Sequence, residues 1–249
     1  MRFCSTAVLL AALAALVTPA PITLAADPEP GPQRIPDAQP EPEAVVESPA
    51  QQRARKVAQA HGLGAWEGVT EVAFTFNVEM PGRTVKRQWL WRPQDQIATL
   101  NPGTPETDTI DLADVTEAMQ DTHAQFVNDT YWLLFPFQLV WSQPELALKQ
   151  GIEAPFGLEA PAAVDQLSVM YPGDGGYTPG DRYDLYLEPA GQTILGWSYH
   201  KGAADVEPTG DGLMSNWAGP TDHGGVKIVE EFTGTDGRFR LFFTDVELK

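Results

Sequence analysis

The sequence predicts an α+β fold, built as one large antiparallel sheet with helices packed on one face. Two observations predict it. The chain runs from strands to helices and back to strands, without the βαβ alternation that is typical of parallel sheets. Its strands are also separated by short turns rich in glycine and proline. Such short connections join antiparallel neighbours, because a parallel pair needs a long crossover.

The first part of the folded region predicts a helix followed by three strands. Residues 52–60 have a helical pattern that ends before two glycines. Apolar residues then alternate with polar ones over 72–78, which indicates a half-buried strand. Two further strands are expected at 85–92 and 96–100, so the three strands together predict an antiparallel meander.

The middle of the chain predicts helices. Apolar residues recur at helical spacing up to Phe126, behind Asp111 as a candidate N-cap. Ser142 and Glu145 fit a capping box, which predicts another helix that ends at Gly151. The intervening apolar segment predicts a helix with one shared face and a bend at a proline; the residues are Trp132, Phe135 and Leu139, with Pro136.

The second half of the chain predicts further antiparallel strands. Short apolar runs alternate there with turns that contain Pro-Gly, Gly-Gly or Asp-Gly pairs. The expected strands are 166–171, 183–188, 193–200, 226–233 and 239–248.

The first 50 residues differ from the predicted domain. Residues 1–26 have the layout of a signal peptide, with an apolar stretch too short to span a membrane and a cleavage point near Ala25 or Ala26. Residues 27–50 contain seven prolines and six acidic residues, so we expect a disordered acidic spacer. A single β-rich domain is expected over 51–249, in a protein exported to the periplasm or the cell exterior.

The amino-acid composition excludes several classes of function. Cys4 precedes the apolar stretch and cannot serve as a lipid-anchoring cysteine at the cleavage point, and the rest of the chain has no cysteine. Disulfides and thiol catalysis are therefore excluded for the mature protein. A net charge of −18 opposes binding to nucleic acids and to anionic lipid surfaces. We expect a soluble monomer with no cofactor and no stable membrane insertion.

Few residues indicate catalytic chemistry. The hydrolase, metalloprotease, phosphate-loop and dinucleotide motifs are absent. His61 and His123 fall near predicted helix ends, where a solvated or capping histidine is ordinary. Asn128 or Asp129 is expected to cap the helix that follows. One metal-assisted alternative stays open, a site formed by Asp181, His200, Asp222 and His223.

The aromatic residues are more informative. They come from the strands and from the helical segment, so they would face one another across a sheet–helix interface. Such a set fits either an ordinary aromatic core or the wall of a ligand cavity. The candidate ligand-binding residues are Phe74, Phe76, Trp89, Trp91, Tyr131, Trp132, Phe135, Phe137, Trp197 and Tyr199.

These residues carry a family resemblance. The meander at 72–92, the segment 129–137 and the strands at 181–199 resemble the LolA-like superfamily of bacterial periplasmic lipoprotein and lipid carriers. The resemblance implies a curved, incomplete β-barrel with helices over a hydrophobic cavity on its concave face. It implies a non-enzymatic protein that binds an acyl chain, lipid or lipoprotein. A metal-assisted hydrolase and an interaction module with a filled core are the alternatives.

Overall fold

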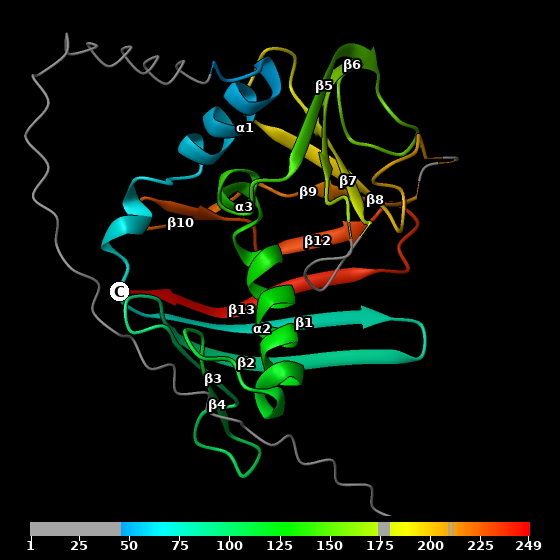
Figure 1. Ribbon diagram of the computed structural model, residues 1–249. Helices are drawn as coiled ribbons and strands as arrows, with labels where there is room; N and C mark the ends of the chain where they lie inside the picture. Colours follow the sequence, from blue (N-terminus) through cyan, green and yellow to red (C-terminus); the bar gives the residue numbers. More distant parts are fainter. Residues whose placement is uncertain (1–45, 174–179, 209, 211) are drawn as a thin grey trace, which may run out of the picture. The chain divides into compact units, whose positions relative to one another are not determined.

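The computed structural model describes residues 46–173, 180–208, 210 and 212–249. The expected signal peptide and most of the expected spacer lie outside these residues. Among the described residues, eleven strands form one sheet in which every neighbouring pair is antiparallel (Figure 1). The sheet is open, with β4 at one edge and β5 at the other, so the predicted α+β class with one large antiparallel sheet is confirmed.

The sheet contains two meanders with a pair of strands between them. The first meander consists of β1 (Val72–Met80), β2 (Arg83–Arg92), β3 (Ile97–Leu100) and β4 (Asp108–Asp111). The second consists of β5 (Glu145–Glu153), β6 (Ala163–Met170), β7 (Arg182–Leu187), β8 (Ile194–His200) and β9 (Leu213–Trp217). Between them lie β12 (Glu231–Gly234), which pairs with β9, and β13 (Arg240–Leu248), which pairs with β1.

The helices and the remaining strands are short. The helices are α1 (Pro49–Ala60), α2 (Gln120–Leu133) and α3 (Phe135–Trp141), with 3₁₀ turns η1 (Ala65–Gly68) and η2 (Glu117–Met119). A separate two-stranded sheet pairs β10 (Thr221–His223) with β11 (Val226–Ile228). Among the described residues no helix has both the length and the hydropathy required to cross a membrane.

Several expectations need correction. The predicted helix from Ser142 to Gly151 is wrong, because this segment forms edge strand β5. Its Leu146 and Leu148 are half-buried while their neighbours are exposed, and they pair with β6, so a period of two overrides the local capping signal. Asp111 ends β4 and is not a helix cap, since the helix starts later. The predicted strand 226–233 is two strands in different sheets.

Both faces of the sheet are covered at the β6–β9 end. The helices pack on one face, which we call the helical face; its core includes Phe74, Leu167 and Leu185. On the opposite face a small second core surrounds Tyr186 and Met214. Every residue of β7 is buried for this reason, with alternate side chains packing on the two faces.

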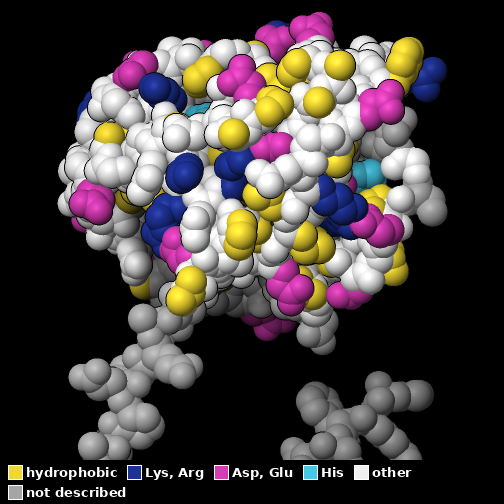
Figure 2. Space-filling model, turned by 90° about the horizontal axis from the view of Figure 1, so that it is seen from above, with side chains coloured by type: hydrophobic (Ala, Val, Ile, Leu, Met, Phe, Trp, Pro, Cys, Tyr) yellow, Lys and Arg dark blue, Asp and Glu magenta, His cyan; other side chains and the backbone are white. Residues whose placement is uncertain are grey.

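The surface carries charges of both signs. Figure 2 shows acidic and basic side chains interspersed on the face seen from above, with hydrophobic side chains scattered among them. Single exposed apolar residues of this kind are normal for soluble domains.

One buried ion pair fixes α1 against the sheet. The Nη1 atom of Arg53 lies 2.9 Å from Oδ2 of Asp165 on β6, and both side chains are buried. The backbone N–H groups of Gly151 and Ala190 also donate to this carboxylate. Burial raises the pKa of Asp165, but these two N–H groups and Arg53 outweigh it, so the pKa lies below its ordinary value.

We predict that this pair makes stability depend on acid pH. The pKa of Asp165 is lower in the folded protein than in the unfolded chain, where it is about 3.9. Its stabilising contribution is complete above the unfolded pKa and is lost as the pH falls through the folded pKa. The variant Asp165→Asn is expected to lose about 3–5 kcal/mol at pH 7, because Arg53 is left buried without its partner.

Chemical denaturation between pH 3 and pH 7 measures both the pH dependence of stability and the loss of stability in Asp165→Asn. The exposed Asp205 gives the matched control, Asp205→Asn, which is expected to unfold like the unmodified protein. Equal unfolding free energies for the two variants at pH 7 would show that the ion pair does not hold α1 in place.

Candidate functional site

The candidate site lies where α2 crosses the helical face. As predicted from Pro136, the helical segment is broken there, because Leu134 leaves helical geometry and α3 begins with Phe135 and Pro136. Trp132 of α2 contacts Trp197 of β8, and Phe126 contacts Trp89 of β2. The helix therefore spans strands from both meanders.

A buried carboxylate attaches α2 to the sheet. Asp129 is fully buried, and its Oδ2 accepts from Nε of Arg87 at 2.7 Å and from the indole Nε1 of Trp89 at 2.8 Å. Its Oδ1 accepts from a second guanidinium nitrogen of Arg87 and from Asn128. The expectation that Asn128 or Asp129 caps a helix is wrong, since both lie inside α2. The bidentate geometry is that of a strong charge-assisted pair.

A cavity of about 270 Å³ opens beside this pair. Strand residues from both meanders and from β13 form its walls, and α2 contributes two side chains. The lining residues are Phe76, Val78, Met80, Arg83, Val85, Arg87, Asn128, Trp132, Asp181, Tyr183, Trp197, Tyr199, Leu213, Phe239 and Leu241. The lining is mostly apolar, with a few polar groups, which is the usual composition of a small-molecule pocket.

Aromatic rings form one wall of the cavity. The ring centroids of Trp132 and Trp197 lie 4.8 Å apart, and Trp132 meets Tyr183 edge-on at 5.7 Å. Trp197 is 1% exposed and Tyr183 is 4% exposed. These rings are held by packing on several sides, so the wall is rigid before any ligand arrives.

The polar groups of the cavity are two hydroxyls, the side-chain amide of Asn128 and three charges. Tyr199 donates from its hydroxyl to Oδ2 of Asp181 at 2.8 Å, and the other oxygen of Asp181 accepts from the backbone N–H of Gly202. The hydroxyl of Tyr183 has no hydrogen-bond partner within the described part of the chain. Burial, together with Tyr199 and Asp181, raises the pKa of Tyr183, so this hydroxyl stays protonated and can donate.

Arginines lie on the other side of the cavity. Arg87 is occupied by Asp129, and its guanidinium also lies over the ring of Phe76, 4.9 Å from the centroid. Arg83 is exposed and has no carboxylate partner among the described residues. The cavity thus combines an apolar interior with hydrogen-bond donors near its rim.

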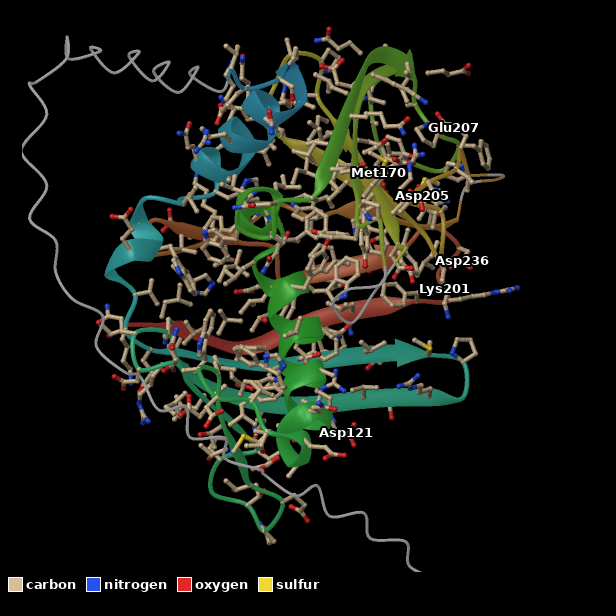
Figure 3. All side chains as sticks on the ribbon, in the orientation of Figure 1. Asp121, Met170, Lys201, Asp205, Glu207 and Asp236 are labelled. Carbon is tan, nitrogen blue, oxygen red and sulfur yellow. The ribbon has the colours of Figure 1, made fainter. Side chains whose placement is uncertain are left out.

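Charged side chains continue beyond this end of the sheet. Gly202, held by Asp181, belongs to the segment that follows β8. Figure 3 shows Lys201, Asp205 and Glu207 of this segment on the same side of the fold as Asp236, which lies in the turn between β12 and β13. Glu207 forms ion pairs with Lys149 and Arg182.

The structure separates the ten sequence-derived ligand residues into groups. Four line the cavity: Phe76, Trp132, Trp197 and Tyr199. Another four, Phe74, Trp89, Phe135 and Phe137, are buried in the filled core. Tyr131 packs on Phe135 and Tyr183 beside the cavity. Trp91 packs on Trp66 and Phe126 and does not line the cavity.

Sequence reasoning missed the smaller and the charged members of the lining. A period of two along β2 places Val85 and Arg87 on the same face as Trp89, so alternation could have found them. The same period of two along β7 places Tyr183 on the same face of the sheet as Leu185. Leu213 could not be found in this way, because β9 follows a glycine-rich stretch that gave no strand signal.

The four residues of the metal-assisted alternative are not brought together. Asp181 is occupied by Tyr199 and Gly202, while Nε2 of His200 lies 3.4 Å from Asp184. Asp222 and His223 belong to the separate β10–β11 sheet, where His223 pairs with Glu230 at 2.9 Å. No group of three or more His, Cys, Asp or Glu side chains in the described residues could hold a metal ion.

Comparisons with known proteins found matches among solved structures. No protein-family model and no curated protein sequence matches the chain. A LolA superfamily protein from Nitrosomonas europaea matches 80% of this chain and 93% of its own, with a TM-score of 0.43 and 9% identity. A Vibrio parahaemolyticus domain named for outer membrane lipoprotein sorting matches 80% of this chain and 92% of its own, with a TM-score of 0.41 and 9% identity.

A third solved structure is a DUF1329 family protein from Desulfovibrio piger. It matches 80% of this chain and 92% of its own, with a TM-score of 0.38 and 8% identity. At such low identity the likeness concerns the fold, and no residue role follows from it.

We predict that the Asp129 carboxylate and Arg87 stabilise the fold as a unit. Asp129→Asn is expected to cost about 3–5 kcal/mol, because Arg87 then lies partly buried without its anion. The double variant Arg87→Gln/Asp129→Asn is expected to lose less than the sum of the two single losses. Denaturant unfolding of the four proteins in this cycle measures the coupling, and strictly additive losses would contradict it.

Proposed function

We propose that this protein is an exported, non-enzymatic binding protein for a hydrophobic or amphiphilic ligand, such as an acyl chain, a lipid or the acyl part of a lipoprotein. The observation that carries the proposal is the cavity of about 270 Å³ between Trp132, Trp197 and the valines of β1 and β2. Each methylene group buried there contributes about 0.8 kcal/mol of favourable transfer free energy. Binding needs no reacting group.

The polar rim supports an amphiphile over a pure hydrocarbon. The protonated Tyr183 hydroxyl and the exposed Arg83 guanidinium are donors without partners among the described residues. A ligand with hydrogen-bond acceptors in its head group would satisfy one of them while its chain enters the apolar interior. Arg87 is already paired with Asp129, so we do not assign it to the ligand head group. Its side chain forms part of the cavity wall.

The proposal includes export. Residues 1–26 would act as a signal peptide cleaved near Ala25 or Ala26, and the mature protein would work as a soluble monomer in the periplasm or outside the cell. Intact mass spectrometry of the exported protein tests the cleavage point, and mature protein that retained residues 1–26 would contradict it.

Filling the cavity is predicted to weaken ligand binding. Leu213→Trp and Val85→Trp each place a large ring into the cavity from opposite walls. Both are expected to weaken binding of a fluorescent dodecanoic acid by about tenfold or more, a change of about 1.4 kcal/mol. Val46→Trp is the matched control, because Val46 is 87% exposed and lines no part of the cavity.

Native extraction gives the direct test. Protein purified without detergent is expected to release lipid or fatty acid that mass spectrometry detects, and the cavity-filling variants are expected to release much less. Empty protein that also fails to bind the fluorescent acid would overturn the proposal. Circular dichroism spectra matching that of the unmodified protein establish that the variants are folded.

A further inference from the structure

A second pocket lies apart from the proposed acyl-chain cavity. It has a volume of about 450 Å³ and forms where the end of α1 meets the start of β8 and the end of β9. No residue lines both pockets. Its polar and aromatic lining residues are His61, Glu159, Gln192, Thr193, Asn216, Trp217 and Lys227.

His61 contributes a buried hydrogen-bond acceptor. It ends α1 as expected from the sequence, and its backbone N–H caps the helix, but its side chain is only 6% exposed rather than solvated. Its Nδ1 lies 2.9 Å from the carbonyl oxygen of Val57. A carbonyl can only accept, so Nδ1 carries the proton and Nε2 presents a lone pair.

The imidazole faces the pocket in its neutral form. Nε2 of His61 has no hydrogen-bond partner among the described residues. Burial lowers the pKa of His61, and the nearby charge of Lys227 lowers it further. The ring meets Trp217 edge-on, with centroids 6.5 Å apart.

Neighbouring strands contribute a positive charge and an amide group to the pocket. Lys227 is exposed between buried Val226 and Ile228 on β11, and it has no carboxylate partner in the described part of the chain. The amide of Asn216 is held by the backbone N–H of Glu159 at 2.8 Å, which leaves its NH₂ group as a donor.

We propose that this second pocket binds a small hydroxylated carboxylate of the sugar-acid class. A ligand hydroxyl donates to Nε2 of His61, the ligand carboxylate pairs with Lys227, and the carbon face of the ligand packs beside Trp217. The lone pair of His61 requires a donor and the ammonium of Lys227 requires an anion, so a ligand that carries both satisfies the pocket.

Three probes of similar length distinguish the need for a hydroxyl group from the need for a carboxylate. Gluconate has hydroxyls and a carboxylate, sorbitol has only hydroxyls, and hexanoate has only the carboxylate. Each is titrated into the full mature protein while the imidazole resonances of His61 are followed by NMR, so that binding in the acyl-chain cavity is not counted. Gluconate is expected to bind about tenfold more tightly than sorbitol or hexanoate.

The variant Lys227→Gln is expected to weaken gluconate binding about fivefold or more and to leave sorbitol binding unchanged. Lys86→Gln, at an exposed lysine of β2 that lines neither pocket, is the matched control and is expected to change neither. Gluconate that fails to shift the His61 resonances at millimolar concentration overturns the proposal. So does equal affinity for gluconate and either of the other probes.

Discussion

The Asp129 carboxylate sets the position of α2, and the candidate site depends on that position. A fully buried charge is tolerated only where its partners match its lone pairs. Here Arg87 supplies two donors and Trp89 a third, all from β2. Because residues three apart share a helix face, Phe126 packs on Trp89 on one side of this anchor and Trp132 reaches Trp197 on the other. The buried Asp129 and the cavity-lining Trp132 therefore lie on the same face of α2.

The cavity also requires long-range strand pairing. Its lining comes from both meanders, and these become neighbours only because β12 pairs with β9 while β13 pairs with β1. Leu241 of β13 lies at the join, opposite Val78 of β1. The site therefore forms only when the whole sheet has formed, without any help from disulfides.

Local patterns predicted most of the sheet. Alternation identified β1, and short runs bounded by turn signals identified β2, β6, β7 and β8 within a few residues. These patterns failed for β5, where the Ser142 and Glu145 signal for a helix is local and the pairing with β6 is not. The role of Asp129 was equally invisible, since a buried ion pair with Arg87 joins residues 42 positions apart.

The sequence could group the aromatic residues but could not separate the filled core from the cavity. The separation follows from side-chain size along two paired strands. At one end, Phe74 is opposite Trp89, and Trp91 follows two residues further along β2. At the hairpin end, Val78 is opposite Val85.

Residues of α2 lie against both the Phe74–Trp89 end and the smaller Val78–Val85 pair. Rings that meet the large end pack in contact with one another, as Trp89 does with Phe126. Trp132 has Trp197 on one side and the small residues of the hairpin end on the other, so space remains beside it. Close packing elsewhere in the core keeps α2 from settling into that space, because Asp129 and Phe126 are already fixed against β2. The cavity is thus the volume left beside Trp132, between a helix fixed against β2 and the smaller Val78–Val85 pair of the sheet.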